Sequence, residues 1–396
     1  MKRLQFALLA CLISCCLSVA AYAQIAPPRT WPELKEAVQD RANRDAYPLT
    51  GTKAEDVREI LSHIDSLDRD QWAQAWSAMG DRYAAKADQL AATDKKAASD
   101  AYLMAYRYYA FGAWPTQNSD GKAAAFKRGI AAFRKHAEMS DPPVEVVNIA
   151  FRGGTYPALL ALPKTGRPAP VVLAIGGLDA YKEYWGERVS TFLAQGIGVL
   201  GLDMPGTGEA PIAIDVGADA MYSAAIDFLH TRPDVDATRL AVLGVSWGGH
   251  WANTLAFTEK QRLRGVVSWG GPADRFFEPE WQKAALGTRE YLFDLFAARS
   301  AVYRTTTLEQ FLNYGPRMSL RTRGFIGQPT APMLLVNGEK DSQVPIDDLY
   351  LLLRSGSPKE AWINPQGGHL GRGPGWPDSK ILNEIIVPWL ARTLAK

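Results

Sequence analysis

The fold of this 396-residue chain is decided by the stretch LAVLGVSWGGHWANTLA, residues 240–256. Its apolar start, 240–243, predicts a buried strand, and its end, 250–256, suits a helix. Between them stands Gly244-Val245-Ser246-Trp247-Gly248, a G-x-S-x-G pentapeptide in the strand–turn–helix setting of a nucleophile elbow. Glycines permit the tight turn, and a serine at a helix N-terminus lies where backbone N–H groups favour negative charge. We therefore predict that Ser246 is a nucleophile.

Short β-branched runs alternate with helical segments on both sides of this stretch. Eight strands are predicted, at residues 144–151, 156–162, 171–175, 198–202, 240–245, 265–269, 333–336 and 360–363. Alternation of this kind predicts an α/β protein with a mostly parallel sheet of about eight strands, flanked by helices. The first two runs are close enough in sequence to form an antiparallel hairpin at the edge.

The residues before the first strand have a helical pattern. Apolar side chains recur at spacings of three and four, as at Trp72, Trp76, Met79 and Tyr83, and further helices are predicted at 100–113 and 123–136. We expect a helical N-terminal domain over 24–140 and a catalytic domain over 141–396. Within the catalytic domain, residues 274–330 predict a helical insertion between two strands, with helices at 290–301 and 308–314.

The first 23 residues have the pattern of a signal peptide. Lys2 and Arg3 precede an apolar run over 6–20, and Ala21-Tyr22-Ala23 is a small-residue cleavage signal. The run is shorter than the roughly 20 apolar residues that span a bilayer, which argues against a retained anchor. We expect a periplasmic or secreted protein without stable membrane insertion. Lipoprotein processing at Cys15 is the less favoured alternative, because the residues after it stay apolar.

Composition excludes several classes of function. All three cysteines (Cys11, Cys15, Cys16) lie in the predicted signal, so a mature chain would have no disulfide, thiolate metal site or cysteine nucleophile. The chain has 44 basic and 42 acidic residues, and without Lys2 and Arg3 the basic count falls to 42. No basic run marks a nucleic-acid surface. No ligand spacing suggests a metal, and we expect no cofactor. A small-molecule substrate is expected, and a homodimer is compatible with the sequence.

A serine nucleophile needs a base, and the chain has five histidines. His369 is the candidate, because it lies in the loop Gly367-Gly368-His369-Leu370-Gly371 after the last predicted strand, where distant residues can meet over the sheet. His250, one turn into the helix after the serine, is interpreted as a packing or hydrogen-bonding residue. Asp341, just beyond the strand at 333–336, is the candidate that would orient His369. Its neighbour Glu339 is the nearest competitor.

The glycines after the strand at 171–175 predict an oxyanion site. In Gly176-Gly177-Leu178-Asp179 small residues let backbone N–H groups face a substrate. One donor would be the N–H of Leu178 or of Gly177, and the other that of Trp247, the residue after the nucleophile. The loop at 203–208 (DMPGTG) lacks the lysine and spacing of nucleotide-binding loops, and we interpret it as a structural turn.

Taken together, these motifs resemble those of the α/β-hydrolases. The elbow, the turn at 202–208, the Asp341-x-x-Val344-Pro345 stretch and the late histidine carry the general likeness. The segments GGLDAYKE (176–183) and SWGG (268–271) resemble more particularly the 2,6-dihydroxypseudooxynicotine hydrolase group and the related fermentation-respiration switch esterases. The resemblance spans roughly residues 75–396.

The resemblance implies an α/β-hydrolase fold with a helical N-terminal domain that caps the active site. It assigns Ser246, Asp341 and His369 as the triad, and it implies that Glu183 lines the pocket. Trp247 would be a bulky group beside the bound substrate. We expect an exported serine hydrolase that cleaves a carboxylic ester. The alternatives are cleavage of a carbon–carbon bond beside a ketone and an inactive, hydrolase-like binding protein, which would have a broken triad.

Overall fold

The computed structural model describes residues 28–395. The predicted signal peptide and its lipidation alternative at Cys15 lie outside the described residues. In the part that the structure describes, no helix has the length and apolar character needed to traverse a bilayer. Nor do any three His, Cys, Asp or Glu side chains of that part gather into a group that could hold a metal ion.

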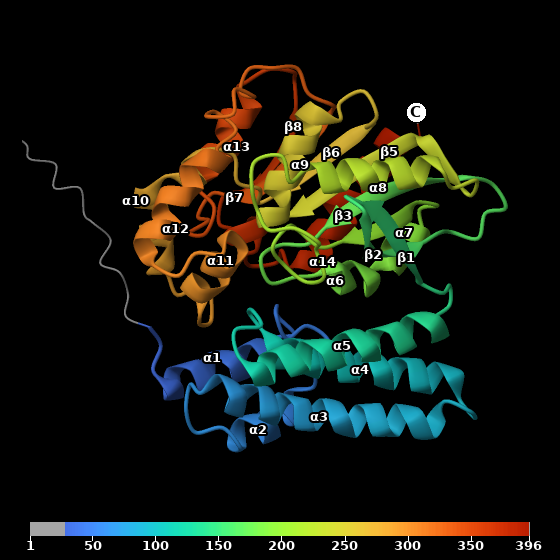
Figure 1. Cartoon of the computed structure of the whole chain (residues 1–396), viewed down its shortest axis with the longest axis vertical. Helices are drawn as coiled ribbons and strands as arrows, with labels where there is room; N and C mark the ends of the chain where they lie inside the picture. The colour runs from blue at the N-terminus through green and yellow to red at the C-terminus, as the bar shows by residue number, and fades with distance from the viewer. Residues whose placement is uncertain (1–27, 396) are drawn as a thin grey trace, which may run out of the picture.

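The eight predicted strands form one sheet, in the order β1-β2-β4-β3-β5-β6-β7-β8 (Figure 1). β2 is antiparallel to both β1 and β4, and the remaining neighbours are parallel. The predicted edge hairpin and the mostly parallel sheet are therefore confirmed. The strands are β1 (Glu145–Phe151), β2 (Gly154–Ala161), β3 (Ala169–Ile175), β4 (Gly198–Leu202), β5 (Val235–Val245), β6 (Gly265–Trp269), β7 (Met333–Gly338) and β8 (Glu360–Asn364).

Helices cover both faces of this sheet. Successive side chains of a strand point to opposite faces, so the apolar strands present side chains to be buried on each face. In β3, Val171 and Leu173 belong to one apolar core, and Val172 and Ala174 belong to the other. The first core includes residues of α8 (Ala220–His230), α9 (Trp247–Thr258) and α13 (Ile346–Leu353). The second includes residues of α6 (Lys182–Gly186), α7 (Val189–Leu193), α14 (Asp378–Ile381) and α15 (Val387–Leu394). Burial on both faces explains why the central strands are continuous apolar runs.

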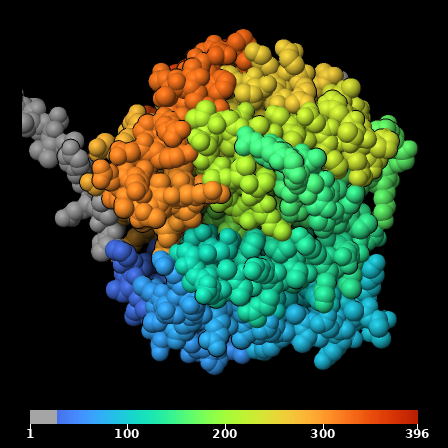
Figure 2. Space-filling view, viewed as in Figure 1, coloured from blue at the N-terminus to red at the C-terminus, as the bar shows by residue number. Residues whose placement is uncertain are grey.

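A layer of helices precedes the sheet and lies to one side of it (Figure 1). It comprises α1 (Trp31–Asn43), α2 (Ala54–Ser62), α3 (Arg69–Leu90), α4 (Lys95–Ala113) and α5 (Asp120–Met139). The three long helices begin at residues whose side chains accept a backbone N–H of the first turn, namely Asp68, Asp94 and Ser119. The space-filling view shows this layer packed closely against the rest of the chain (Figure 2).

The insertion between β6 and β7 is helical, and the helix predicted at 308–314 is confirmed, but the other helices differ from those predicted. It contains α10 (Pro279–Leu286), which the sequence pattern did not predict, α11 (Leu295–Tyr303) and α12 (Leu308–Tyr314). The expected helix start at 290 is wrong. Asp294 adopts a left-handed backbone (φ +56°), which interrupts the helix there. The residues before it contact separate regions: Glu290 accepts the backbone N–H of His369, and Leu292 packs into the core of the helical layer.

Candidate active site

Ser246 occupies a strained turn between β5 and α9. Its φ of +53° and ψ of −125° are unusual for a residue with a side chain. The turn is possible because backbones approach closely around it. A Cβ on Gly248 would lie 2.1 Å from the carbonyl oxygen of Gly176, and one on Gly244 would lie 2.2 Å from that of Gly248. The two glycines of the pentapeptide therefore allow the close contact between β5, α9 and the loop after β3.

The structure brings Ser246, His369 and Asp341 together. His369 Nε2 lies 2.8 Å from Ser246 Oγ, and His369 Nδ1 lies 2.8 Å from Asp341 Oδ2. The other carboxylate oxygen of Asp341 accepts the backbone N–H groups of Gln343 and Val344, at 2.7 and 2.9 Å. Asp341 follows β7 and His369 follows β8, so the carboxyl ends of neighbouring strands position both side chains.

The environment of His369 favours a protonated imidazole. Burial on its own would lower the pKa of His369, but the charge and hydrogen bond of Asp341 outweigh burial and raise that pKa above its usual value. The Glu290 carboxylate adds to the rise. An imidazole stabilised in this way can take a proton from a hydroxyl at 2.8 Å and return it to a leaving group.

The predicted oxyanion donors surround Ser246. A Cβ on Gly177 would lie 3.2 Å from the Cβ of Ser246, so this loop passes directly beside the nucleophile. The backbone N–H groups of Gly177, Leu178 and Trp247 donate no hydrogen bond to any residue that the structure describes. All three residues line the same cavity as Ser246. Unpaired N–H groups beside a serine nucleophile are suited to hold a negative oxygen.

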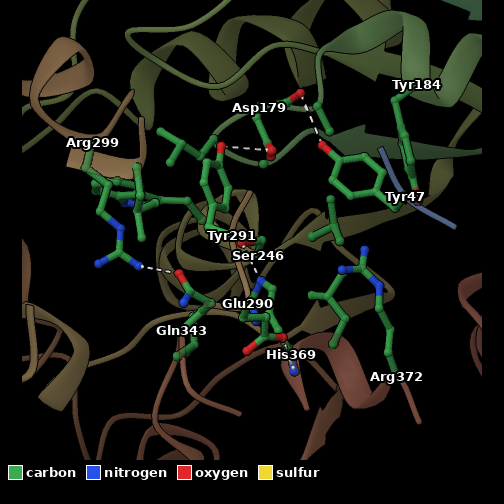
Figure 3. Close-up of a pocket in the computed structure, with 18 of the residues that line it drawn as sticks. Tyr47, Asp179, Tyr184, Ser246, Glu290, Tyr291, Arg299, Gln343, His369 and Arg372 are labelled. Atoms are coloured by element: carbon green, nitrogen blue, oxygen red, sulfur yellow. Dashed lines mark hydrogen bonds between the residues drawn. The ribbon is translucent and has the colours of Figure 1, made fainter. Parts of the chain in front are cut away.

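The cavity beside Ser246 is built from three regions of the chain (Figure 3). Arg41, Tyr47 and Trp114 reach it from the helical layer, whereas Tyr291 and Arg299 reach it from the insertion. Its volume is about 70 Å³. The lining is largely aromatic and aliphatic, with a few polar side chains, as in sites for small molecules.

Glu290 is a residue of this site that the sequence did not indicate. One of its carboxylate oxygens accepts the backbone N–H of His369 at 2.9 Å, and the other accepts the hydroxyl of Ser342. Glu290 thus holds the loop that carries the histidine and acts on the charge of its ring. It stands 79 residues before His369 in an irregular loop, and no local pattern connects the two positions.

Asp179 joins the three regions at the mouth of the oxyanion loop. Its carboxylate accepts Trp114 Nε1 at 2.7 Å and the Tyr291 hydroxyl at 2.9 Å, and its backbone carbonyl accepts the Tyr47 hydroxyl at 3.2 Å. Trp114 also stacks on Tyr291, with ring centroids 4.8 Å apart. The helical layer, the insertion and the loop of Leu178 are therefore connected through one side chain.

The implied role of Glu183 at the pocket is corrected by the structure. Glu183 is buried away from the cavity and lies 2.8 Å from the ammonium of Lys182, which also contacts Asp203 and Glu209. Asp203 in turn accepts the backbone N–H groups of Lys182 and Glu209. This network holds the turn at 203–208, which is structural as predicted. The carboxylate of Glu183 turns to the neighbouring cation because burial without a partner is costly.

Two further interpretations concern residues close to the nucleophile. His250 is fully buried, and its Nδ1 lies 3.3 Å from the Pro272 carbonyl, so the predicted packing role agrees with its position. Burial lowers the pKa of His250 to about 3 and keeps the ring neutral. The indole of Trp247 packs edge-to-face on Phe276 and Tyr303 and contributes to the cavity wall.

The family model described as "Esterase FrsA-like" matches residues 52–362. The chain belongs to this family. It is 26% identical over 298 residues to an esterase FrsA of Photobacterium profundum, which covers 74% of this chain and 70% of the relative. It is also 26% identical over 281 residues to the 2,6-dihydropseudooxynicotine hydrolase of Paenarthrobacter nicotinovorans, covering 69% and 72% of the two chains.

Solved structures agree on the fold. The crystal structure of a 2,6-dihydroxy-pseudo-oxynicotine hydrolase aligns with a TM-score of 0.75 at 21% identity, over 87% of this chain and 93% of that one. The α/β-hydrolase fold and the predicted family resemblance are therefore confirmed, and this FrsA-like protein is a hydrolase of the esterase family.

Proposed function

We propose that this FrsA-like protein hydrolyses a small carboxylic ester through an acyl-enzyme on Ser246. The observation that carries the proposal is the continuous chain of contacts from Ser246 Oγ through His369 to Asp341, each 2.8 Å long. A hydrolase-like binding protein without activity has no need for this arrangement, which includes a strained backbone at the serine.

In the proposed reaction, His369 accepts the proton of Ser246 as the hydroxyl oxygen attacks the ester carbonyl. The oxyanion that forms is stabilised by the N–H groups of Leu178 and Trp247, and His369 gives its proton to the departing alcohol. Water then cleaves the acyl-enzyme by the same steps. Asp341 holds the imidazole in the required tautomer and stabilises the imidazolium.

An ester is favoured over the carbon–carbon alternative because of the position of Glu183. The resemblance to a carbon–carbon hydrolase implies that Glu183 lines the pocket, but in this chain Glu183 lies outside the cavity, paired with Lys182. The small cavity, lined in part by residues of the helical layer and the insertion, favours short or aromatic esters over polymers. Faster turnover of a polymer than of its monomeric ester would contradict this assignment.

The deciding experiment compares residues 24–396 with the Ser246→Ala variant on 4-nitrophenyl acetate, butyrate and octanoate. We expect the variant to lose at least about 10³-fold in kcat, because the nucleophile cannot be replaced by the rest of the site. A fluorophosphonate probe should label the wild-type protein and not the variant. Turnover that persists in Ser246→Ala would reject the acyl-enzyme mechanism.

We also propose that the protein acts outside the cytoplasm. The support is the sequence pattern alone, namely the basic residues Lys2 and Arg3, the apolar run and the Ala21-Tyr22-Ala23 signal. Expression of the full chain, followed by N-terminal sequencing of the exported protein, should give Gln24 as the first residue. A lipid-modified N-terminus at Cys15 would support the lipoprotein alternative, and retention of Met1 in the cytoplasm would contradict export.

A further inference from the structure

Arg299 places a positive charge in the wall of the catalytic cavity. It projects from α11, is only 3% exposed and lines the cavity that contains Ser246 and His369 (Figure 3). Burial lowers the pKa of Arg299 to about 10, which leaves the guanidinium charged at neutral pH. Removing such a cation from water is costly unless an anion compensates it.

No carboxylate of the described residues compensates this charge. No Asp or Glu oxygen of residues 28–395 lies within the 4.0 Å of an ion pair with Arg299. Besides Tyr291 and Tyr303, the carboxylate of Asp341 raises the pKa of Arg299, but its two oxygens already contact His369 and the backbone N–H groups of its own loop. Among residues 28–395, the charge of Arg299 is therefore not matched by a carboxylate.

Neutral groups hold the guanidinium in a fixed orientation. Arg299 donates to the amide oxygen of Gln343 at 3.1 Å and to that of Gln282 at 3.2 Å, and it lies over the ring of Phe276. The amide nitrogens of both glutamines donate elsewhere, to the Thr288 hydroxyl and to the Phe276 carbonyl. Their oxygens consequently face Arg299, so the network orients the cation without neutralising it.

The other two arginines of the cavity, Arg372 and Arg41, differ from Arg299 in their burial or in their charged partners. Arg372 forms a two-point ion pair with Asp378, at 2.6 and 2.8 Å. Arg41 is only partly buried and donates to the backbone carbonyls of Tyr47 and Glu290, which connects the helical layer to the insertion. Arg299 is the deeply buried guanidinium of the three for which a charged partner is missing among the described residues.

We propose that Arg299 binds a carboxylate carried by the substrate, so that the natural ester is a monoanion. A guanidinium presents parallel N–H donors that match the two oxygens of a carboxylate. The anion would complete the ion pair only in the complex, which would make Arg299 a specificity-determining residue. The proposal rests on the proposed ester hydrolysis, because it deepens the assignment of that same site.

Two pairs of substrates test where the carboxylate lies. Monoethyl glutarate carries it on the acyl group, and ethyl 5-oxohexanoate replaces it by a neutral methyl ketone. 4-Acetoxybutanoate carries it on the leaving group, and 5-acetoxy-2-pentanone is its neutral counterpart. We expect kcat/KM to favour the anionic member of at least one pair by about 30-fold or more.

Variants identify the residue responsible for that preference. In Arg299→Gln the ratio of kcat/KM for the anionic over the neutral ester should fall by about 30-fold or more, mainly through KM, and Arg299→Lys should recover part of it. Arg323→Gln is the matched control, since Arg323 is a partly buried arginine outside the cavity, 3.5 Å from Asp219. This control should keep the wild-type ratio.

Binding to the Ser246→Ala variant separates this proposal from the proposed reaction. Calorimetry should show tighter binding of the anionic ester than of its neutral counterpart, and the difference should vanish in Ser246→Ala/Arg299→Gln. That result supports the anion site even if no ester is hydrolysed. Equal binding of both esters would overturn it, and so would a preference that Arg41→Gln removes and Arg299→Gln leaves intact.

Discussion

At the residue scale, the charge state of His369 depends on two carboxylates that come from different parts of the chain. Asp341 contacts the ring, and Glu290 contacts the backbone N–H of the same residue. Both raise the pKa of His369 against the effect of burial. Because the base must be neutral to accept a proton, we expect kcat/KM to fall as the pH drops through this raised pKa.

Glu290→Gln should move that acidic limb to lower pH. The substitution removes a negative charge that raises the pKa of His369, and the amide oxygen can still accept the His369 N–H. The measurement is the pH profile of kcat/KM from pH 5 to 9 for a neutral ester. An unchanged or upward-shifted limb would show that Glu290 positions the loop without acting on the imidazole charge.

Comparison of Asp341→Asn with Glu339→Gln tests which of the two carboxylates orients His369. An amide at this position disfavours the tautomer that accepts the serine proton, and kcat should fall by roughly 10³- to 10⁴-fold. Glu339→Gln is the control, because the Glu339 carboxylate accepts the exposed Tyr350 hydroxyl and no group of the triad. Equal losses in the two variants would reject the assignment of Asp341.

At the element scale, the turn between β5 and α9 depends on contact between backbones. A Cβ on Gly248 would collide with the carbonyl oxygens of Gly176 and Ile175, at 2.1 and 2.8 Å. Neither oxygen can move without displacing the end of β3. Gly248→Ala should therefore lower the free energy of unfolding by about 3 kcal/mol or prevent folding.

Gly154→Ala is the matched control for this substitution. Gly154 begins β2, and its Cβ would meet only the Phe151 carbonyl oxygen at 3.9 Å. Urea denaturation should show a change within about 0.5 kcal/mol in this variant. Comparable losses in both variants would mean that loss of glycine flexibility, and not the collision at the elbow, determines the stability change.

At the scale of the whole molecule, Asp179 connects the helical layer and the insertion to the oxyanion loop. The N–H of Trp114 Nε1 and the Tyr291 hydroxyl donate to the same carboxylate oxygen of Asp179, so Asp179→Asn removes the negative charge from both hydrogen bonds and weakens them. We expect a loss of about 1–3 kcal/mol in the free energy of unfolding. Hydrogen exchange over residues 287–294 should accelerate, and kcat/KM should fall because Leu178 is adjacent.

Asp81→Asn controls for the loss of a hydrogen-bonded carboxylate within the helical layer alone. Asp81 accepts the Tyr109 hydroxyl and pairs with Arg128 on the surface. It should leave exchange over residues 287–294 and kcat/KM at wild-type values. Unchanged exchange in Asp179→Asn as well would show that Asp179 does not connect these regions.

Boundaries within the insertion were predicted less well than the strands. All eight strands were found because most contain a short, buried apolar run between turn residues. The first half of β5, Val235–Arg239, was missed because it is largely polar and only partly buried. The helix expected from residue 290 begins at Leu295 instead, and α10 was missed. These helices pack against segments that are distant in the sequence. Their ends therefore depend on contacts that a local sequence pattern does not reveal.

The sequence by itself determined the sheet, the elbow and the three residues that meet there, whose catalytic roles stay predictions. Strand burial, a G-x-S-x-G turn and polar residues after strand ends are local patterns, and parallel strands bring their carboxyl ends together. Only the tertiary structure decided that Glu290 supports His369, that Asp179 connects three regions, that Glu183 pairs with Lys182 and that Arg299 faces the cavity. Those contacts join residues that have no fixed spacing, because packing between separate layers sets which side chains meet.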